Sequence, residues 1–477
     1  MDSQLGAVID GKQVVTENTV PVIDPSTGEV FAYTADCGPF EVDLAVAAAR
    51  TAGAAWKRVA VAERARILRA IGQLVLRDLE ELGELESRQT GKPLAQGRRD
   101  AELTARYFDF YASAIETFGG TTIPLNDETL IFTRWEPHGV TAHVVPWNYP
   151  LQIMARSVAP SLAMGNGCVL KPAEEAPLTA LRMAQLVEEA GLPSGLLNVI
   201  PGYGETAGAA LTGHHDVDHI SFTGSVEVGQ IISRAAAMRT IPVTMELGGK
   251  SPNIVFADAD LDRAVPVLVN AILQNAGQTC SAGARLLVES GIHDELVARI
   301  ETAFAAVKIG PALENPVLGP LITAEQRQRV LRYIDQARET ATIRFGGQAL
   351  NGGIYGDGYF VQPTLIDDVD PTSAIAQEEI FGPVLVVTSF ETIQEAVDLA
   401  NGTDFGLVAG VWTTNVTTAH RMIRDVQSGQ VFVNTYGASG GVELPFGGFK
   451  RSGHGREKGA EGLRGFGQIK TAVVAFS

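Results

Sequence analysis

Apolar residues recur every three or four positions through the first quarter of the chain. Between residues 40 and 118, the segments DLAVAAARTAGAAW and ERARILRAIGQLVLRDLEELGELES both have this spacing. A period near 3.6 residues places apolar side chains on one face of a helix. The pattern therefore predicts a run of amphipathic helices over residues 40–118.

From about residue 139 the pattern changes to short β-like runs that alternate with helical segments. The sequences PLQIMARSVAPSLA and TALRMAQLVEEA, for example, have helical spacing. Such alternation is typical of a parallel sheet covered by helices. The strands of this first series are predicted at residues 140–145, 168–171, 196–200, 219–223 and 243–247.

A second alternating series predicts a second α/β domain, and the boundary falls near ELGGKSP, residues 246–252. Two further segments, 121–137 and 467–477, are strand-like but fit neither series. One interpretation is that these two segments pair and form an arm or an interface. The second series contains strands at 251–256, 284–288, 383–390 and 429–435, and helices at 260–274, 292–307 and 323–339.

Composition excludes several classes of protein. A chain of 477 residues is too long for one hydrophobic core, so two or three domains are expected. The net charge of −18 argues against a nucleic-acid partner, which would require a basic face. No apolar run reaches the roughly 20 residues of a membrane span, and the first residues do not have the pattern of a signal peptide.

The three cysteines point to one candidate nucleophile. They are too few for a disulfide framework and lack the spacing of a metal site, which favours a cytoplasmic protein with no bound metal. Cys168 opens the apolar run CVLK and is expected in the core. Cys280 lies instead in NAGQTCSAGAR, where small neighbours leave the sulfur accessible. The alternative is an incidental loop cysteine.

A nucleophilic thiol needs a proton acceptor, and none of the eight histidines has an obvious catalytic setting. Glu246 ends the apolar run VTMEL, where burial would raise its pKa and suit it to act as a general base. In PWNYP, the prolines restrict the backbone around Asn148, whose amide could donate to an oxyanion. The alternatives are a solvated strand end for Glu246 and an ordinary turn residue for Asn148.

Two further strand ends have groups suited to a dinucleotide. Ser225 in FTGS begins a helix, and a helix N-terminus with Gly and Ser offers hydrogen-bond donors to a phosphate. In KPAE, Lys171 precedes Glu174, and a carboxylate near a ribose favours a free 2′-hydroxyl over a 2′-phosphate. A simple helix N-cap and a solvated loop are the respective alternatives.

These motifs occur in a consistent order: PWNYP, KPAE, FTGS, ELGGK, GQTCSAG, EEIFGPV and PFGGFKRSGHGRE. Together, and over essentially the whole chain, they resemble the aldehyde dehydrogenase superfamily of NAD(P)-dependent, non-metal enzymes. The resemblance implies an α/β fold with two Rossmann-like domains and a small β oligomerisation arm. It assigns residues 1–116 and 138–248 to an NAD-binding domain, 249–450 to a catalytic domain, and 117–137 with 465–477 to the arm.

The resemblance also implies a role for each catalytic residue. Cys280 would attack the aldehyde to form a thiohemiacetal, which becomes a thioester after hydride transfer to the nicotinamide. Asn148 and the backbone N–H of Cys280 would hold the oxyanion. Glu246 would activate the water that hydrolyses the thioester. Members that transfer the acyl group to coenzyme A generally lack this base, so a free acid is the expected product.

For the cofactor, the resemblance implies NAD, with NADP also possible, because Glu174 would lie at the ribose. Lys171 would bind the adenosine ribose as well, and Leu247 would line the nicotinamide pocket. The remaining residues would surround the pyrophosphate, the adenine, and the nicotinamide with its ribose: Trp147, Gly224, Ser225, Val228, Gly229, Glu379 and Phe381.

The resemblance places Tyr149, Gln152, Ile153 and Arg156 in the aldehyde channel. Relatives that oxidise succinate semialdehyde have an arginine at the position of Arg156, where it grips the distant carboxylate. Their second arginine corresponds here to Gln274, so half of the clamp is missing. A polar aldehyde, such as an acidic semialdehyde, is the hypothesis. The alternatives are an aromatic or sugar-derived aldehyde, and an Arg156 that simply pairs with a local acid.

Two other classes of function remain open from the sequence. One is a cysteine esterase or hydrolase that uses Cys280 and Glu246 without a cofactor, although it would have no use for FTGS, KPAE or EEIFGPV. The other is a catalytically silent protein on the same fold. The family resemblance further implies a homodimer or homotetramer, a small-molecule aldehyde as substrate, and no membrane partner.

Overall fold

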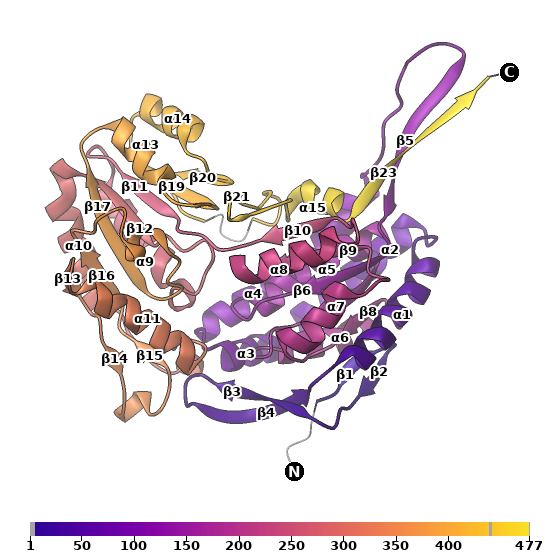
Figure 1. The fold of residues 1–477 in the computed structure, drawn as a ribbon, viewed down its shortest axis with the longest axis horizontal. Coiled ribbons are helices and arrows are strands. Elements are labelled where there is room, and N and C mark those ends of the chain that lie inside the picture. The colour runs from indigo at the N-terminus through magenta and orange to yellow at the C-terminus, as the bar shows by residue number, and fades with distance from the viewer. Residues whose placement is uncertain (1–4, 438–440, 477) are drawn as a thin grey trace.

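The computed structural model describes residues 5–437 and 441–476, so residues 1–4, 438–440 and 477 of the predicted domains and arm lie outside it. Two sheets with covering helices follow one another along the chain (Figure 1). Both contain neighbouring parallel strands, as the alternating pattern predicts. Within the described residues, no helix is both long and apolar enough to cross a membrane.

The first sheet has eight strands in the order β2-β1-β8-β7-β6-β9-β10-β22. Its five central strands are parallel, and antiparallel strands flank them at both edges. The strands are β1 (Ala7–Ile9), β2 (Lys12–Val14), β6 (Val140–Val144), β7 (Gly167–Lys171), β8 (Leu197–Val199), β9 (His219–Thr223), β10 (Val243–Glu246) and β22 (Gly453–His454).

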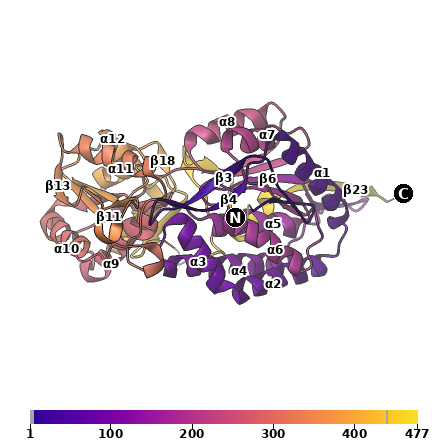
Figure 2. The same ribbon diagram turned by 90° about the horizontal axis from the view of Figure 1, so that it is seen from below.

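Helices cover both faces of this sheet. In Figure 2, α1, α7 and α8 lie on one side and α2 to α6 on the other. Every residue of β7 and β9 is buried, as expected for strands sandwiched between helices. The helices are α1 (Pro39–Trp56), α2 (Val61–Arg77), α3 (Leu79–Thr90), α4 (Leu94–Glu116), α5 (Pro150–Met164), α6 (Leu178–Glu189), α7 (Ala209–Gly213) and α8 (Val226–Ala237).

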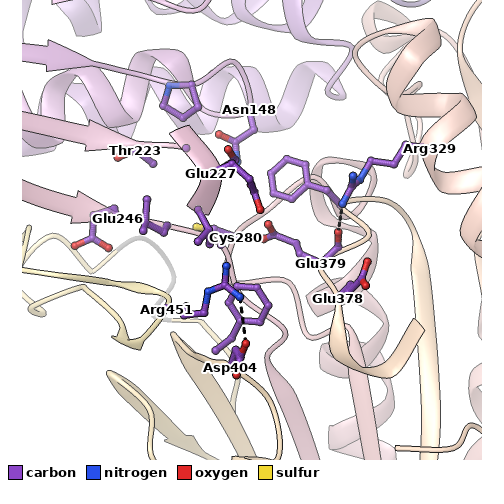
Figure 3. A pocket seen from close by; sticks show the side chains of 18 of the residues that line it. Asn148, Thr223, Glu227, Glu246, Cys280, Arg329, Glu378, Glu379, Asp404 and Arg451 are labelled. Atoms are coloured by element: carbon purple, nitrogen blue, oxygen red, sulfur yellow. Dashed lines mark hydrogen bonds and ion pairs between the residues drawn. The ribbon is translucent and has the colours of Figure 1, made fainter. Parts of the chain in front are cut away.

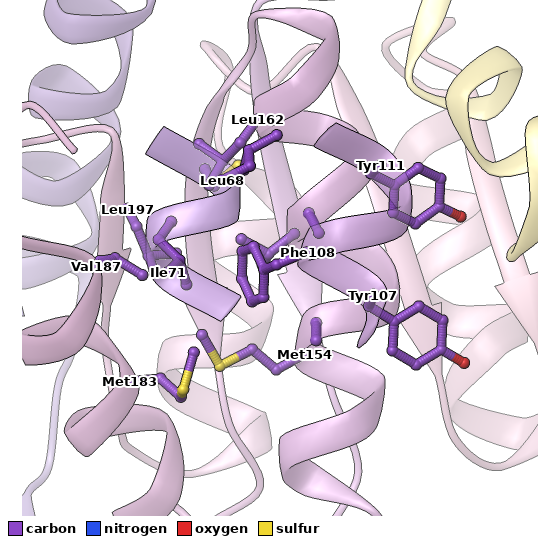
Figure 4. Packing of buried hydrophobic residues seen from close by; sticks show 14 of the residues in the cluster. Leu68, Ile71, Tyr107, Phe108, Tyr111, Met154, Leu162, Met183, Val187 and Leu197 are labelled. Atoms are coloured by element: carbon purple, nitrogen blue, oxygen red, sulfur yellow. The ribbon is translucent and has the colours of Figure 1, made fainter. Parts of the chain in front are cut away.

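The predicted helical run over residues 40–118 is confirmed as α1 to α4. The apolar faces of α2 and α4 pack on α5, which is almost wholly buried (Figure 4). Leu68 and Ile71 of α2 meet Phe108 of α4 and Met154 of α5 in this core. The core fixes α5, and α5 in turn begins at the PWNYP turn.

The second sheet has seven strands in the order β13-β16-β17-β12-β11-β19-β20, all parallel to their neighbours except β13. Three of these strands, β13, β16 and β19, are absent from the sequence prediction. The strands are β11 (Pro252–Val255), β12 (Arg285–Glu289), β13 (Thr342–Phe345), β16 (Thr364–Asp367), β17 (Val384–Phe390), β19 (Val408–Trp412) and β20 (Gln430–Val433). The helices are α9 (Leu261–Leu273), α10 (His293–Ala305), α11 (Ala324–Ala337), α12 (Ala374–Gln377), α13 (Ile393–Asn401) and α14 (Val416–Asp425).

The two strand-like segments outside both series pair with each other, as predicted. β5 (Thr129–Pro137) and β23 (Gly467–Ala475) form an antiparallel ribbon that projects from the body (Figure 1). Helix α15 (Gly459–Gly465) leads into β23. The smaller ladders are β3 (Thr19–Asp24) with β4 (Glu29–Ala35), β14 (Ala349–Leu350) with β15 (Phe360–Val361), and β18 (Phe405–Gly406) with β21 (Phe449–Lys450).

Candidate active site

A cavity of about 770 Å³ opens between the two sheets (Figure 3). One wall consists of residues at the ends of β6, β9 and β10, the carboxyl edge where α/β sheets bind ligands. The other wall comes from segments beside the second sheet. Nine residues predicted from the sequence line this cavity: Trp147, Asn148, Gly224, Ser225, Glu246, Leu247, Cys280, Glu379 and Phe381.

Cys280 lies in the turn between α9 and β12. The chain bends sharply there because Asn275, Ala276 and Gly277 all have positive φ angles, of 50°, 54° and 73°. Gly249 packs on the carbonyl group of Cys280 so closely that a Cβ at this position would overlap it. The small residues around the cysteine thus allow the backbone to bring it to the cavity.

The Cys280 side chain is only partly buried and faces the cavity. Burial raises the pKa of its thiol to about 12; Arg156 opposes this rise, while Glu379 and Glu246 add to it. The thiol is therefore protonated at neutral pH. A nucleophilic role requires that its proton be taken up when substrate binds, since the thiolate is the reactive form. The two other cysteines, Cys37 and Cys168, are buried, and Cys168 is in the core as predicted.

Asn148 is held in place by several hydrogen bonds. Its Nδ2 donates to the carbonyl oxygen of Gln278 at 2.9 Å, and its Oδ1 accepts from the backbone N–H of Tyr149 at 3.1 Å. The Nδ2 of Asn275 donates to the Asn148 carbonyl oxygen at 2.9 Å. An amide has two N–H donors, so one remains to point at a ligand beside Cys280.

Glu246 ends β10 and is only 1% exposed. Neither of its carboxylate oxygens has a hydrogen-bond partner among the described residues. Burial raises the pKa of Glu246, and the neighbouring Glu457 adds to the rise, while Arg156 opposes it. In Figure 3 the carboxylate is turned away from the sulfur of Cys280. A buried, unpartnered carboxylate with a raised pKa has the properties of a general base.

The FTGS segment begins α8. Ser225 caps this helix, with its Oγ accepting from the backbone N–H of Val228 at 3.3 Å. Val228 is 43% exposed on the first turn, outside the cavity lining. Gly229 lies against Leu247, because a Cβ there would approach the leucine Cδ2 to 2.7 Å. The free N–H groups of this helix end thus open toward the cavity edge.

An aromatic pair joins the two walls of the cavity, and a partly buried acid lies two residues before its phenylalanine. Trp147 and Phe381 meet edge to face, with ring centroids 5.3 Å apart. Glu379 accepts from the backbone N–H of Gly249 at 3.0 Å. Burial raises the pKa of Glu379 to about 7, although that hydrogen bond lowers it.

Lys171 and Glu174 also lie outside the cavity lining and form an ion pair of 2.7 Å at the end of β7. The lysine is buried and the carboxylate is about one-third exposed.

The four residues predicted for the aldehyde channel are not part of the cavity lining. The hydroxyl of Tyr149 lies 2.9 Å from Thr279 Oγ1 and accepts from Gln274 Nε2 at 2.8 Å, which brings it next to Cys280 in the chain. Gln152 donates to Asp100, and Ile153 is buried. Arg156 forms a buried ion pair with Glu457.

Comparison with known proteins decides the family. The model of the aldehyde dehydrogenase family matches residues 13–472. The chain belongs to this family. The resemblance drawn from the seven motifs is therefore confirmed, as is the α/β fold.

Individual aldehyde dehydrogenases match over almost their whole lengths. Retinal dehydrogenase 2 of Homo sapiens is 42% identical, covering 95% of this chain and 88% of that protein. A putative aldehyde dehydrogenase from Burkholderia cenocepacia superposes with a TM-score of 0.97 at 50% identity, covering 99% and 100%. The NAD⁺ complex of an aldehyde dehydrogenase from Bacillus cereus has a TM-score of 0.97 at 38% identity, covering 100% and 97%.

Some residues at or beside this cavity have no role in the sequence prediction. Glu457 belongs to the motif PFGGFKRSGHGRE, but its burial beside Glu246 was not foreseen. Arg329 and Arg451 also line the cavity. An arginine on a helix or in a turn has no local signal of a ligand, because most such residues are solvated.

Proposed function

We propose that the protein oxidises an aldehyde to the free carboxylic acid with NAD, through a thiohemiacetal and a thioester on Cys280. One observation carries this proposal. Cys280, Asn148 and Glu246 line the same cavity, which also borders the N-terminus of α8. A nucleophile, an oxyanion donor and a base are the groups that this reaction requires.

The lining fits a dinucleotide. The N-terminus of α8 and the Ser225 hydroxyl offer donors to a pyrophosphate. Gly248 leaves no room for a Cβ, which would overlap the Glu379 carboxylate, so only bare backbone fits at that point. Trp147 and Phe381 supply aromatic surface. When bound, NAD supplies the acceptor for the hydride that leaves the substrate carbon.

The protein's own groups perform the remaining steps. The Cys280 sulfur adds to the carbonyl carbon, and its proton leaves the site. Asn148 Nδ2 and the Cys280 backbone N–H hold the oxygen as it gains charge. After oxidation, Glu246 takes a proton from the water that attacks the thioester carbon. The C–S bond breaks, the acid is released, and the departing thiolate of Cys280 takes up the proton from Glu246, so both groups return to their starting forms.

Preference for NAD over NADP rests on Glu174. Its carboxylate, held by Lys171, suits a ribose with a free 2′-hydroxyl and would repel a 2′-phosphate. Solved relatives described as NAD⁺ complexes support this assignment.

The substrate that fits best is a polar aldehyde without a distant carboxylate. The hypothesis of an acidic aldehyde depends on a free Arg156, whereas Glu457 already compensates its charge. Tyr149 and Gln274 supply neutral polar groups beside the cysteine turn. Sugar-derived and aromatic aldehydes are the other candidates for the test below.

A panel of aliphatic, aromatic, acidic and sugar-derived aldehydes, each with NAD and NADP, tests the proposal through absorbance of reduced cofactor. We expect turnover with NAD, loss of turnover in Cys280→Ala, and retained NAD binding in that variant. Ester hydrolysis without any binding of NAD would instead support the cysteine hydrolase.

We also propose that the two parts of the chain have different roles. Residues 1–116 and 138–248 would bind NAD, and residues 249–450 would carry the nucleophile. The β5–β23 ribbon exposes Leu130, Ile469 and Val473, which supports its use in a homodimer or homotetramer. Light scattering after deletion of residues 467–477 tests this role, with a lower mass expected.

A further inference from the structure

Arg156 and Glu457 form a buried ion pair between two distant parts of the chain. Their side chains are 7% and 1% exposed. Arg156 also donates from Nη2 to Thr223 Oγ1 at 3.2 Å, and its guanidinium lies 5.2 Å from the centre of the Phe446 ring. Glu457 Oε1 accepts from Ser221 Oγ at 3.0 Å. These contacts fix both charges in place.

The pair borders Glu246 on two sides. Thr223, which accepts from Arg156, is the register partner of Glu246 in neighbouring parallel strands, so their side chains point to the same face. On the other side, Glu457 pairs with Phe446 through the backbone. The next residue, Gly447, touches Glu246, since a Cβ there would lie 2.9 Å from Oε1.

Arg156 offsets part of the effect that Glu457 has on Glu246. Glu457 is the acid that disfavours ionisation of Glu246, and Arg156 is the leading cation that favours it. Arg456 and Lys458 act in the same direction with smaller effect. Without the guanidinium, two buried carboxylates would stand beside each other, and one of them would remain protonated.

We propose that Arg156 is a positioning residue for the general base: its ion pair with Glu457 compensates the second acid and favours the ionised form of Glu246, which activates water. This inference rests on the proposed function, in which Glu246 is that base. It gives Arg156 a role in thioester hydrolysis for every substrate, whereas a substrate clamp would affect only aldehydes with a distant carboxylate.

Hydrolysis of an acetyl group on Cys280 isolates this step. 4-Nitrophenyl acetate transfers its acetyl group to the sulfur and releases nitrophenolate as a burst; water then hydrolyses the thioester at the steady-state rate. The steady rate is measured from pH 5 to pH 9 in wild type, Arg156→Met and Arg156→Lys. No aldehyde or NAD is needed, so substrate preference does not enter the result.

For Arg156→Met we expect an unchanged burst, but a midpoint of the acidic limb that moves up by about one pH unit or more. Such a shift corresponds to roughly tenfold slower hydrolysis on that limb. Arg156→Lys keeps a positive charge and should retain most of the wild-type profile. Arg156→Met/Glu457→Gln removes both charges, and its midpoint should return toward that of wild type.

An unmoved midpoint in Arg156→Met would overturn the inference, and a higher KM confined to acidic aldehydes would then identify a clamp. Arg64→Met, which removes a buried arginine of α2 outside the site, controls for the loss of such a side chain. Circular dichroism confirms folding of each variant. Glu246→Gln separates the two claims: if its hydrolysis equals that of wild type, the proposed base is wrong, and the inference fails with it.

Discussion

Lys92 is buried between two acids, and replacing it should destabilise the fold severely. Its Nζ lies 3.2 Å from Glu86 Oε1 and also contacts Asp100 Oδ2. The Lys92 and Glu86 side chains are fully buried, and that of Asp100 is 3% exposed. Burial lowers the pKa of Lys92, but Asp100 and Glu86 together outweigh this and raise it. In Lys92→Met, both acids lose their cation.

The expected loss in the free energy of unfolding depends on the two acids that remain buried. Removal of one partner from a buried ion pair costs about 3–5 kcal/mol. Glu86 keeps hydrogen bonds from Thr179 and Gln89, at 3.0 Å and 3.2 Å, and Asp100 keeps one from Gln152, so the lower half of this range applies. A loss of about 3 kcal/mol reduces the folding equilibrium constant roughly 10²-fold.

Urea unfolding, followed by circular dichroism, measures this loss in Lys92→Met at pH 8 and pH 5. Burial already raises the pKa of Asp100 to about 6, and removal of Lys92 raises it further. An acid whose pKa is higher in the folded state than in the unfolded state destabilises the fold at pH values above its folded-state pKa, where it is ionised. This destabilisation disappears below the unfolded-state pKa, where the acid is protonated in both states. The deficit should therefore be smaller at pH 5 than at pH 8. Lys12→Met, at an exposed lysine, should change little.

Two results would refute this reasoning about the buried charges. The first is a loss below about 1 kcal/mol at pH 8, the range of an exposed pair. The second is an equal loss at both pH values. In addition, Lys92→Met/Glu86→Gln/Asp100→Asn should be more stable than Lys92→Met, because no uncompensated charge remains buried.

Three further predictions concern the cavity. Asn148→Ala should lower kcat by about 10²–10³ with NAD affinity unchanged, as titration calorimetry can check; an unaltered kcat would exclude the amide as an oxyanion donor. Glu174→Ser should raise kcat/KM for NADP relative to NAD, and an unchanged ratio would disprove the assignment of the ribose site. Burial raises the pKa of the Cys280 thiol to about 12, so the rate of iodoacetamide labelling without ligands should increase about tenfold per pH unit from pH 7 to pH 9. A labelling rate that reaches a plateau near pH 7 would contradict this.

Periodicity was sufficient to predict the long helices and the central strands, but not the short or irregular strands. β2 has three residues, two of them exposed, which is too few to establish alternation. β19 contains Gly410, which weakens a strand signal in the sequence. The structure explains this glycine, because a Cβ there would overlap the Asn253 side chain and lie 2.7 Å from Tyr436 Cδ2. That reason exists only in the folded molecule.

The same contrast applies to the site. Asn148 and Ser225 follow predicted strands, and Glu246 lies at the end of another. Parallel strands end at one edge of their sheet, so the convergence of these residues could be predicted. The turn before Cys280 was also foreseen from its small residues. The positive φ angles at Asn275 and Ala276 were not, since non-glycine residues seldom adopt them.

Contacts between distant segments explain why the sequence could not decide between the two roles of Arg156. An arginine beside a nucleophile has the same sequence signal whether it binds a substrate carboxylate or one of the protein's own acids. Glu457 reaches it only because the segment after β21 folds back along β10, where β22 pairs with Met245 and Glu246. The pairing of β22 with β10 thus brings Glu457 next to Glu246. A substitution that loosened β22 would be expected to alter thioester hydrolysis before it altered attack by Cys280, because the cysteine turn is anchored separately through Asn275 and Gln278.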